Sequence, residues 1–200
     1  MAIKSKLANL NQVLKNNGLD AVAFVPGSNF RKLFGRDFNL MERPLVVVVP
    51  AVGDPVAIVP NLEMVSFEKI KFPGKIFDWR DEDGFTSAFQ SAANALPQLK
   101  NSRRFGLEGQ RMRAFEHMAL ADIFPDASFT DEQQLISSIR LKKSPHEIAL
   151  LKRAIEISET ALEKTLAQVK PGLTEMQIKS VLMHELFANG AEALSFDPIV

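Results

Sequence analysis

Two short runs of β-branched residues, each bounded by prolines, constrain most strongly what this chain can fold into. Residues 44–50 read PLVVVVP and residues 55–60 read PVAIVP, and Gly53 and Asp54 lie between them. Valine and isoleucine favour extended backbone, whereas glycine and aspartate favour a tight turn. Proline cannot donate a ladder hydrogen bond, so it suits the end of a strand. We therefore predict a β-hairpin over residues 44–60.

The remainder of the first two thirds of the chain alternates between strand-like and helical patterns. The other expected strands cover residues 21–25, 75–79, 103–109 and 127–130, and the expected helices cover residues 3–16, 62–70, 86–96 and 111–123. Alternation of this kind, with one hairpin, predicts an α/β domain whose mixed sheet is flanked by helices. We assign this domain to residues 1–133 and a linker to residues 134–144.

The pattern changes to long amphipathic helices after Ser144. Apolar residues recur along one face over residues 145–169, which predicts a single helix there. Ser144 and Glu147 have the spacing of a capping box, and Pro145 occupies the first helical position, where proline is favoured. The surroundings of Ser144 are therefore the predicted domain boundary.

A second helix is predicted from Thr174, which forms a capping box with Gln177, to the neighbourhood of Gly190. We assign residues 145–200 to the incomplete beginning of another domain, because the apolar faces of these helices have no predicted sheet to cover them. Exposed apolar surface favours association. The sequence therefore predicts self-association through this part of the chain, or mobility of it.

Composition excludes several classes of partner. Lysine plus arginine and aspartate plus glutamate both number 24, so no net charge attracts a nucleic acid. The chain has no cysteine, which removes disulfides, thiolate nucleophiles and cysteine-based zinc sites. No apolar run approaches the roughly 20 residues of a membrane helix, and the start has no signal-peptide pattern. We predict a soluble cytoplasmic protein that binds neither nucleic acid nor membrane.

The motifs of common active sites are missing or incomplete. His184 and Glu185 begin the zinc-protease pattern H-E-x-x-H, but Ala188 stands in place of the second histidine. The acidic residues 78–84 lack the oxygen-donor order of a calcium loop. Neither a glycine-rich phosphate loop nor a G-x-S-x-G elbow occurs. The residues themselves therefore nominate no catalytic group and no metal ligand.

The segment with most promise in the first domain covers residues 29–44, NFRKLFGRDFNLMERP. It places phenylalanines beside arginines, including Phe30 and Arg36, ahead of a strand. Loops in such positions carry a larger fraction of binding residues than their share of the chain length. Two interpretations remain open: the segment binds a substrate, or its phenylalanines close the core while its arginines face solvent.

The order of these signals resembles the creatinase/prolidase/aminopeptidase P family of metallopeptidases, which have the pita-bread fold. In the first domain, residues 30–60 resemble the family's substrate-side segment with its Glu-Arg-Pro and paired strands, and RRFGLEG (103–109) resembles its strand ending in glycine-hydrophobic-glutamate. IRLKKSPHEIALLKRAIEISETAL (139–162), VKPGLTEMQI (169–178) and GAEALSFDPIV (190–200) then follow in the order found at the start of the catalytic domain. Arg36 departs from the family, which usually has an aromatic residue after the glycine.

The resemblance implies an N-terminal creatinase-like domain followed by the first helices of a truncated pita-bread α+β domain. In the family, two divalent metal ions (Mn, Co or Zn) activate a water for hydrolysis of the bond preceding proline. The family's five metal ligands and catalytic histidines lie downstream of the segment equivalent to Ser195–Val200. The resemblance thus implies that this chain alone holds no metal and is inactive, and that the full-length enzyme is a homodimer acting on proline-containing peptides. A non-catalytic peptide- or protein-binding relative and a creatinase-like amidinohydrolase are the alternatives.

The resemblance also nominates residues for substrate binding. Phe196 and Ile199 resemble residues that line the apolar substrate pocket of prolidase-like members, although they are equally compatible with the core of a strand. Together with Phe30 and Arg36 they form the predicted substrate-binding set. Asp197 is not assigned as a ligand, because the family's metal aspartates come later.

Overall fold

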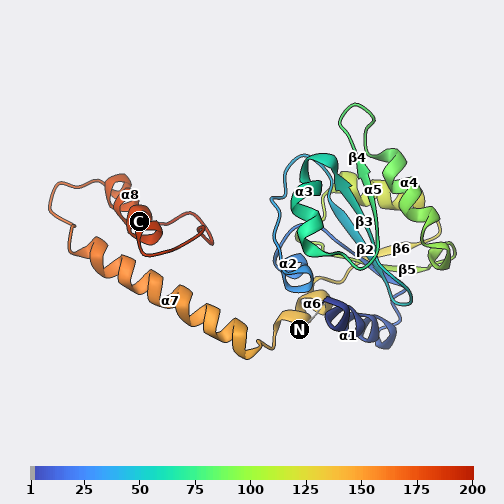
Figure 1. The fold of residues 1–200 in the computed structure, drawn as a ribbon, viewed down its shortest axis with the longest axis horizontal. Coiled ribbons are helices and arrows are strands. Elements are labelled where there is room, and N and C mark those ends of the chain that lie inside the picture. Colours follow the sequence, from blue (N-terminus) through green and yellow to red (C-terminus); the bar gives the residue numbers. More distant parts are fainter. Residues whose placement is uncertain (1–2) are drawn as a thin grey trace. The chain divides into compact units, whose positions relative to one another are not determined.

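The computed structural model describes residues 3–200; residues 1 and 2 of the predicted first domain lie outside it. The chain divides into two compact units, one ending at Leu141 and the other covering Lys142–Val200. Each unit is described by itself below, and Figure 1 gives the labels of its elements.

The described part of the first unit contains six strands, six α-helices and four 3₁₀-helices. The strands are β1 (Ala21–Phe24), β2 (Val46–Pro50), β3 (Val56–Pro60), β4 (Lys75–Trp79), β5 (Arg104–Leu107) and β6 (Ser128–Asp131). The α-helices are α1 (Ile3–Asn16), α2 (Ser28–Phe34), α3 (Met64–Phe67), α4 (Thr86–Asn94), α5 (Ala114–Ile123) and α6 (Gln133–Ser137). Short 3₁₀-helices are η1 (Asn61–Glu63), η2 (Glu68–Ile70), η3 (Pro97–Leu99) and η4 (Ser138–Arg140).

The strands form one mixed sheet in the order β4-β3-β2-β1-β5-β6. The predicted hairpin is confirmed, because β2 and β3 pair antiparallel with Val47 opposite Ala57. β1 is antiparallel to β2 and parallel to β5, while β3 with β4 and β5 with β6 are parallel pairs. The α/β class with a mixed sheet is therefore confirmed.

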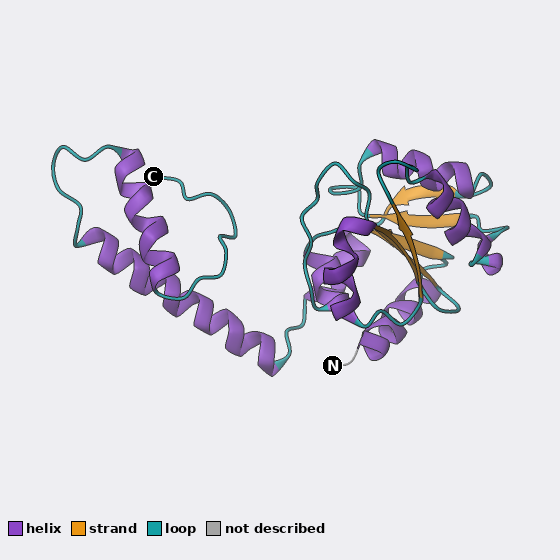
Figure 2. Ribbon diagram, turned by 45° about the horizontal axis from the view of Figure 1, so that its top comes forward, coloured by secondary structure: helices purple, strands orange, loops and turns teal. Residues whose placement is uncertain are grey.

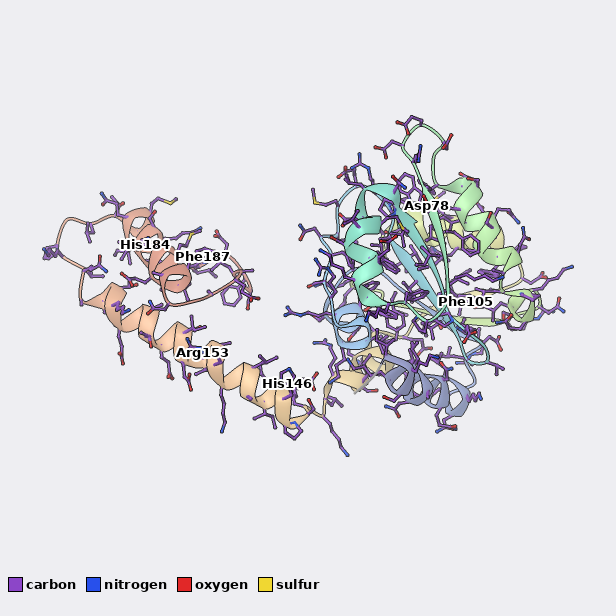
Figure 3. The ribbon with its side chains drawn as sticks, viewed as in Figure 1. Asp78, Phe105, His146, Arg153, His184 and Phe187 are labelled. Atoms are coloured by element: carbon purple, nitrogen blue, oxygen red, sulfur yellow. The ribbon has the colours of Figure 1, made fainter. Side chains whose placement is uncertain are left out.

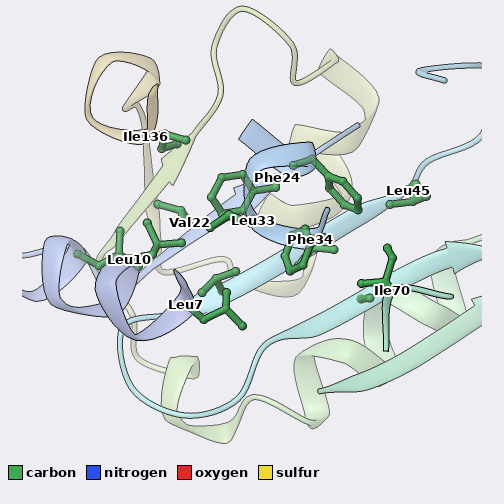
Figure 4. Close-up of a cluster of buried hydrophobic side chains, with 14 of the residues drawn as sticks. Leu7, Leu10, Val22, Phe24, Leu33, Phe34, Leu45, Ile70 and Ile136 are labelled. Carbon is green, nitrogen blue, oxygen red and sulfur yellow. The ribbon is translucent and has the colours of Figure 1, made fainter. Parts of the chain in front are cut away.

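Helices cover both faces of this sheet (Figure 2). Successive strand residues point to opposite faces, so Val22 and Phe24 of β1 enter one hydrophobic cluster while Ala21 and Ala23 enter the other. The first cluster takes side chains from α1, α2, α3 and α6, and the second takes them from α4 and α5. Figure 4 shows the first cluster around β1 and α2. The central strands read as continuous apolar runs because both faces are buried.

The second unit consists of α7 (Pro145–Leu166), α8 (Glu175–Ala188) and a final segment without regular secondary structure. Both predicted capping boxes are confirmed. The Glu147 amide donates to Ser144 Oγ at 3.2 Å and the Ser144 amide donates to Glu147 Oε2 at 2.8 Å. Thr174 and Gln177 exchange the equivalent bonds at 3.3 and 2.8 Å.

The apolar residues of α7 remain largely exposed. Their exposed fractions are 45% for Ile148, 50% for Leu151, 54% for Ile155, 48% for Leu162 and 61% for Leu166. The buried residues of α7 are two small ones, Ala161 and Thr165. These apolar side chains are therefore not covered by the described residues of the second unit.

Two segments of the first unit form α-helices that the sequence does not predict. Residues 28–34, predicted as part of a loop, form α2, because Phe30, Leu33 and Phe34 bury one helical face. Within the predicted linker 134–144, α6 and η4 extend to Arg140, since Ile136 is fully buried against the sheet.

Candidate functional site

The promising segment of the first domain begins as a buried helix. Phe30 has no exposed surface, and its ring centroid lies 4.7 Å from that of Phe34 and 5.8 Å from that of Phe38. α2 ends at Gly35, whose φ of 78° is left-handed and therefore suits glycine. The phenylalanines thus close the core beneath the loop that follows.

That loop, residues 35–45, is held by contacts on both flanks. Arg43 donates to the carboxylate of Asp81, with Nε–Oδ1 and Nη2–Oδ2 distances of 2.8 and 2.6 Å, and also pairs with Glu42. The hydrogen bond from Arg43 lowers the pKa of Asp81 and raises that of Arg43. Trp79 Nε1 donates to the Pro44 carbonyl at 3.2 Å. The loop is therefore ordered although it lies at the surface.

α5 supplies the opposite flank of the same loop. Arg113, immediately before α5, donates to the Met41 carbonyl and, at 3.4 Å, to the Arg43 carbonyl. Its other partner is Glu116, which is fully buried. Arg36 lies in the same loop but is exposed, and it makes no hydrogen bond or ion pair with any residue in the described range 3–200. Arg36 is thus the cation of this loop that faces solvent.

The two candidates at the end of the chain are both exposed. Phe196 is 74% exposed and Ile199 is 91% exposed, in a segment that forms no strand. Between them, Asp197 pairs with Lys179 of α8, which attaches the segment to the helix. Phe30 and Arg36 belong to the first unit, whereas Phe196 and Ile199 belong to the second. The four predicted substrate-binding residues are therefore divided between the two units, two in each.

A buried polar group that the sequence analysis missed lies at the carboxyl end of β5. Glu108 has no exposed surface; its carboxylate accepts from the Val25 amide at 3.2 Å and from Asn29 Nδ2 at 2.8 Å. Asn29, itself 2% exposed, accepts at Oδ1 from Arg140 Nε at 2.6 Å. Glu108 belongs to the glycine-hydrophobic-glutamate pattern of residues 103–109, which carries the family resemblance but gives the glutamate no role.

Burial raises the pKa of Glu108, against the opposing effects of its hydrogen bonds from Asn29 and Val25 and of the charges of Arg111 and Arg140. A raised pKa means that the folded state binds the proton more tightly than the unfolded state. The associated stability is therefore fully present below the unfolded pKa, about 4.3, and is lost as the pH rises through the folded pKa.

We expect the difference in unfolding free energy between wild type and Glu108→Gln to fall as the pH rises from 4 and then to level off. Urea unfolding at a series of pH values measures it. Glu68→Gln, at an exposed position, controls for loss of one carboxylate. A difference that stays constant between pH 4 and 8 would contradict the assignment of the raised pKa to Glu108.

The histidines and carboxylates do not assemble into a metal site. Within residues 3–200, no group of three or more histidine, aspartate or glutamate side chains is placed to hold a metal ion. His146 lies in the first turn of α7 and His184 lies on α8, well apart in Figure 3. No helix in the described part of the chain is long and apolar enough to cross a membrane.

Two family models match the chain in succession. The model described as the creatinase/prolidase N-terminal domain matches residues 6–142, and that of metallopeptidase family M24 matches residues 149–200. Among curated proteins, an uncharacterized peptidase of Staphylococcus saprophyticus is 28% identical over 195 residues, covering 98% of this chain and 53% of the relative. The uncharacterized peptidase YqhT of Bacillus subtilis is 25% identical, covering 98% and 52%.

Solved structures of a prolidase and an Xaa-Pro dipeptidase share the fold of this chain. A prolidase from Thermococcus sibiricus matches with a TM-score of 0.88 at 24% identity, covering 100% of this chain and 53% of that one. An Xaa-Pro dipeptidase from Bacillus anthracis matches with a TM-score of 0.79 at 21% identity, covering 98% and 52%. At these identities the likeness establishes the fold. The chain spans about half the length of the relatives that it matches.

Proposed function

Because this chain belongs to the creatinase/prolidase family through residues 6–142 and carries the start of an M24 peptidase domain, we propose that it is the N-terminal half of an Xaa-Pro dipeptidase. The observation that carries the proposal is the succession of the two family domains along one chain, at residues 6–142 and 149–200. The whole protein would hydrolyse the peptide bond that precedes proline.

The proposed role of this half is to receive the peptide. Arg36 offers a solvent-facing cation on a loop that Arg43 and Arg113 hold in place, and a guanidinium pairs well with a peptide carboxylate. Phe196 and Ile199 offer exposed apolar surface suited to a proline ring. Phe30 is fully buried against Phe34 and Phe38, so its proposed part is to pack under the loop rather than to touch the peptide.

The residues described here do not fit a binuclear metal site, because no three potential ligands converge within residues 3–200. The proposal therefore assigns the two divalent ions (Mn, Co or Zn) to ligands in the remainder of the whole protein. When bound, such ions activate a water and polarise the scissile carbonyl. The exposed apolar residues of α7 support a further part of the proposal, that the rest of the peptidase domain or the partner subunit of a homodimer covers this helix.

The test is hydrolysis by the whole protein, expressed at full length from its own gene, with residues 1–200 assayed beside it. We expect the whole protein to release proline from Xaa-Pro dipeptides with Mn²⁺, Co²⁺ or Zn²⁺, to lose this activity in a chelator and to regain it when metal is restored. We expect no release from residues 1–200.

Three outcomes would contradict the proposal. Peptide binding without hydrolysis in any of the three metals would identify a non-catalytic relative. Hydrolysis of creatine in place of Xaa-Pro peptides would identify an amidinohydrolase. Turnover by residues 1–200 alone would show that the reaction needs no further ligands.

A further inference from the structure

Two neighbouring strands of the first unit run parallel, but the chain leaves them toward opposite faces of the sheet. β1 pairs with β5, with Ala23 opposite Leu107 at their carboxyl ends. The segment after β1 leads to α2, which packs in the first hydrophobic cluster, whereas the segment after β5 leads to α5, which packs in the second. In open α/β sheets, ligands bind in the crevice where two such segments diverge. The topology therefore favours a ligand site at this end of β1 and β5.

A buried chain of polar side chains lies at this point. Glu108, directly after β5, has no exposed surface, and its two carboxylate oxygens accept from the Val25 amide at 3.2 Å and from Asn29 Nδ2 at 2.8 Å. Asn29 is 2% exposed, and its Oδ1 accepts from Arg140 Nε at 2.6 Å. Both oxygens of Glu108 are thus engaged by the protein, so a ligand would meet the cations around this chain.

Arg111 is the first of these cations and lies over the turn between β1 and α2. A Cβ built at Gly27 would stand 2.6 Å from both Cδ and Nε of Arg111, so the arginine rests where a side chain at position 27 would be. Its one hydrogen bond within residues 3–200 is a long one, from Nη1 to the Pro26 carbonyl at 3.5 Å. The remaining donors of this exposed guanidinium are therefore available to a ligand.

Arg140 is the second cation and reaches the same turn, at Asn29, two residues beyond Gly27. It is fixed through Nε, and its Nη1 and Nη2 have no hydrogen-bond partner in the described part of the chain. Burial raises the pKa of Glu108, whereas its hydrogen bonds and the charges of Arg111 and Arg140 act against this effect, so both guanidiniums lie near its carboxylate. All of these residues belong to the first unit.

The chemistry of the available groups selects the ligand. A guanidinium only donates hydrogen bonds, so the groups left at this point are donors. Two guanidiniums beside one ionised carboxylate leave one positive charge in excess. A carboxylate or phosphate group supplies both acceptors and negative charge, and it pairs with arginine through two parallel hydrogen bonds. A cationic ligand would be repelled and would find no free acceptor on either arginine.

We propose that Arg111 and Arg140 bind the oxyanion of a small molecule, a carboxylate or a phosphate group, at the carboxyl ends of β1 and β5. Asn29 holds Arg140 through Nε, which leaves Nη1 and Nη2 for the oxyanion. The site shares no residue with the loop that carries Arg36. The inference does not depend on the reaction that the whole protein performs.

Isothermal titration calorimetry of the 200-residue chain with sodium phosphate, and separately with sodium acetate, tests the site at constant ionic strength. We expect saturable binding of at least one probe with a dissociation constant of about 1 mM or below. Arg111→Met should weaken this binding at least about tenfold, because hydrogen bonds to a charged group are lost. Arg111→Lys should weaken it less, since the charge stays while the planar fork of donors is lost.

Arg103→Met is the matched control, because Arg103 is an exposed arginine of the same unit whose removal changes the net charge equally. It should leave the dissociation constant unchanged. Amide NMR spectra locate the bound probe: we expect shifts concentrated at residues 26–29 and 108–111. Tighter binding of phosphate would assign the site to a phosphorylated molecule, and tighter binding of acetate would assign it to a carboxylic acid.

Three results would overturn the oxyanion site. The first is a dissociation constant above about 10 mM for both probes. The second is equal weakening by Arg103→Met and Arg111→Met, which would mean that the anion responds only to the net charge. The third is a set of amide shifts that leaves out both segments, 26–29 and 108–111.

Discussion

Replacing Phe30 by alanine will lower the free energy of unfolding of the first unit by about 3–5 kcal/mol. The side chain has no exposed surface, and its ring packs on Phe34 and Phe38 at centroid distances of 4.7 and 5.8 Å. The substitution removes buried apolar area and aromatic contacts together and leaves a cavity. Urea unfolding followed by the fluorescence of Trp79, which lies in this unit, measures the loss.

Phe196→Ala is the matched control for the same change of side chain. Its ring is 74% exposed, so its removal should change the free energy of unfolding by less than about 0.5 kcal/mol. A cost below about 1 kcal/mol for Phe30→Ala would mean that Phe30 is not a core residue, and would return it to the group of possible peptide contacts. The pair thus separates the two interpretations of the phenylalanines in residues 29–44.

The parts of the fold that the sequence predicts are those with local causes. The hairpin of β2 and β3 follows from two β-branched runs and a turn within 17 residues, at 44–60. The starts of α7 and α8 follow from side chains that bond to the backbone three residues away. Such signals lie within a short window and need no knowledge of the rest of the molecule.

α2 and α6 escape sequence reasoning because tertiary contacts stabilise them. α2 has seven residues, and its N-cap residue is Gly27, which has no side chain to cap the helix. Helices this short are marginal unless packing supports them, and here Phe30 and Leu33 supply it from one face. α6 has five residues and is held by Ile136 in the same cluster. Neither contact is visible before the sheet is assembled.

The residues of the candidate site show the same division between local sequence signals and contacts that form only in the folded chain. Arg36 could be nominated from its neighbours in the sequence, whereas Asp81 and Arg113, which hold its loop through Arg43, lie in other segments. The chain from Glu108 through Asn29 to Arg140 is less accessible still, because its members are separated by 79 and 111 positions. Phe196 and Ile199 were nominated by resemblance, and their role stays a prediction.

Replacing Gly74 by alanine is the second substitution with a large expected effect, because another backbone lies against it. A Cβ built at Gly74 would stand 1.8 Å from the carbonyl oxygen of Pro55 and 2.8 Å from its carbonyl carbon. Pro55 and Gly74 directly precede β3 and β4, whose parallel pairing begins with Val56 opposite Lys75. No rotamer change can relieve a contact with backbone, so the strands must move apart. We expect a loss of at least about 3 kcal/mol in the free energy of unfolding, the upper end for overpacking.

Gly84→Ala is the control that measures backbone strain without a steric clash. Gly84 has a left-handed φ of 69°, but a Cβ added there would meet nothing within 4 Å, so alanine should cost about 1–2 kcal/mol from conformation alone. An equal or greater loss at Gly84 than at Gly74 would contradict the argument from close approach.

The effect at Gly74 should also reach the candidate loop, because β4 ends at Trp79, which donates to Pro44, and leads to Asp81, which holds Arg43. A displaced β4 would therefore release both contacts, and the pKa of Asp81 in Gly74→Ala should return upward toward its ordinary value.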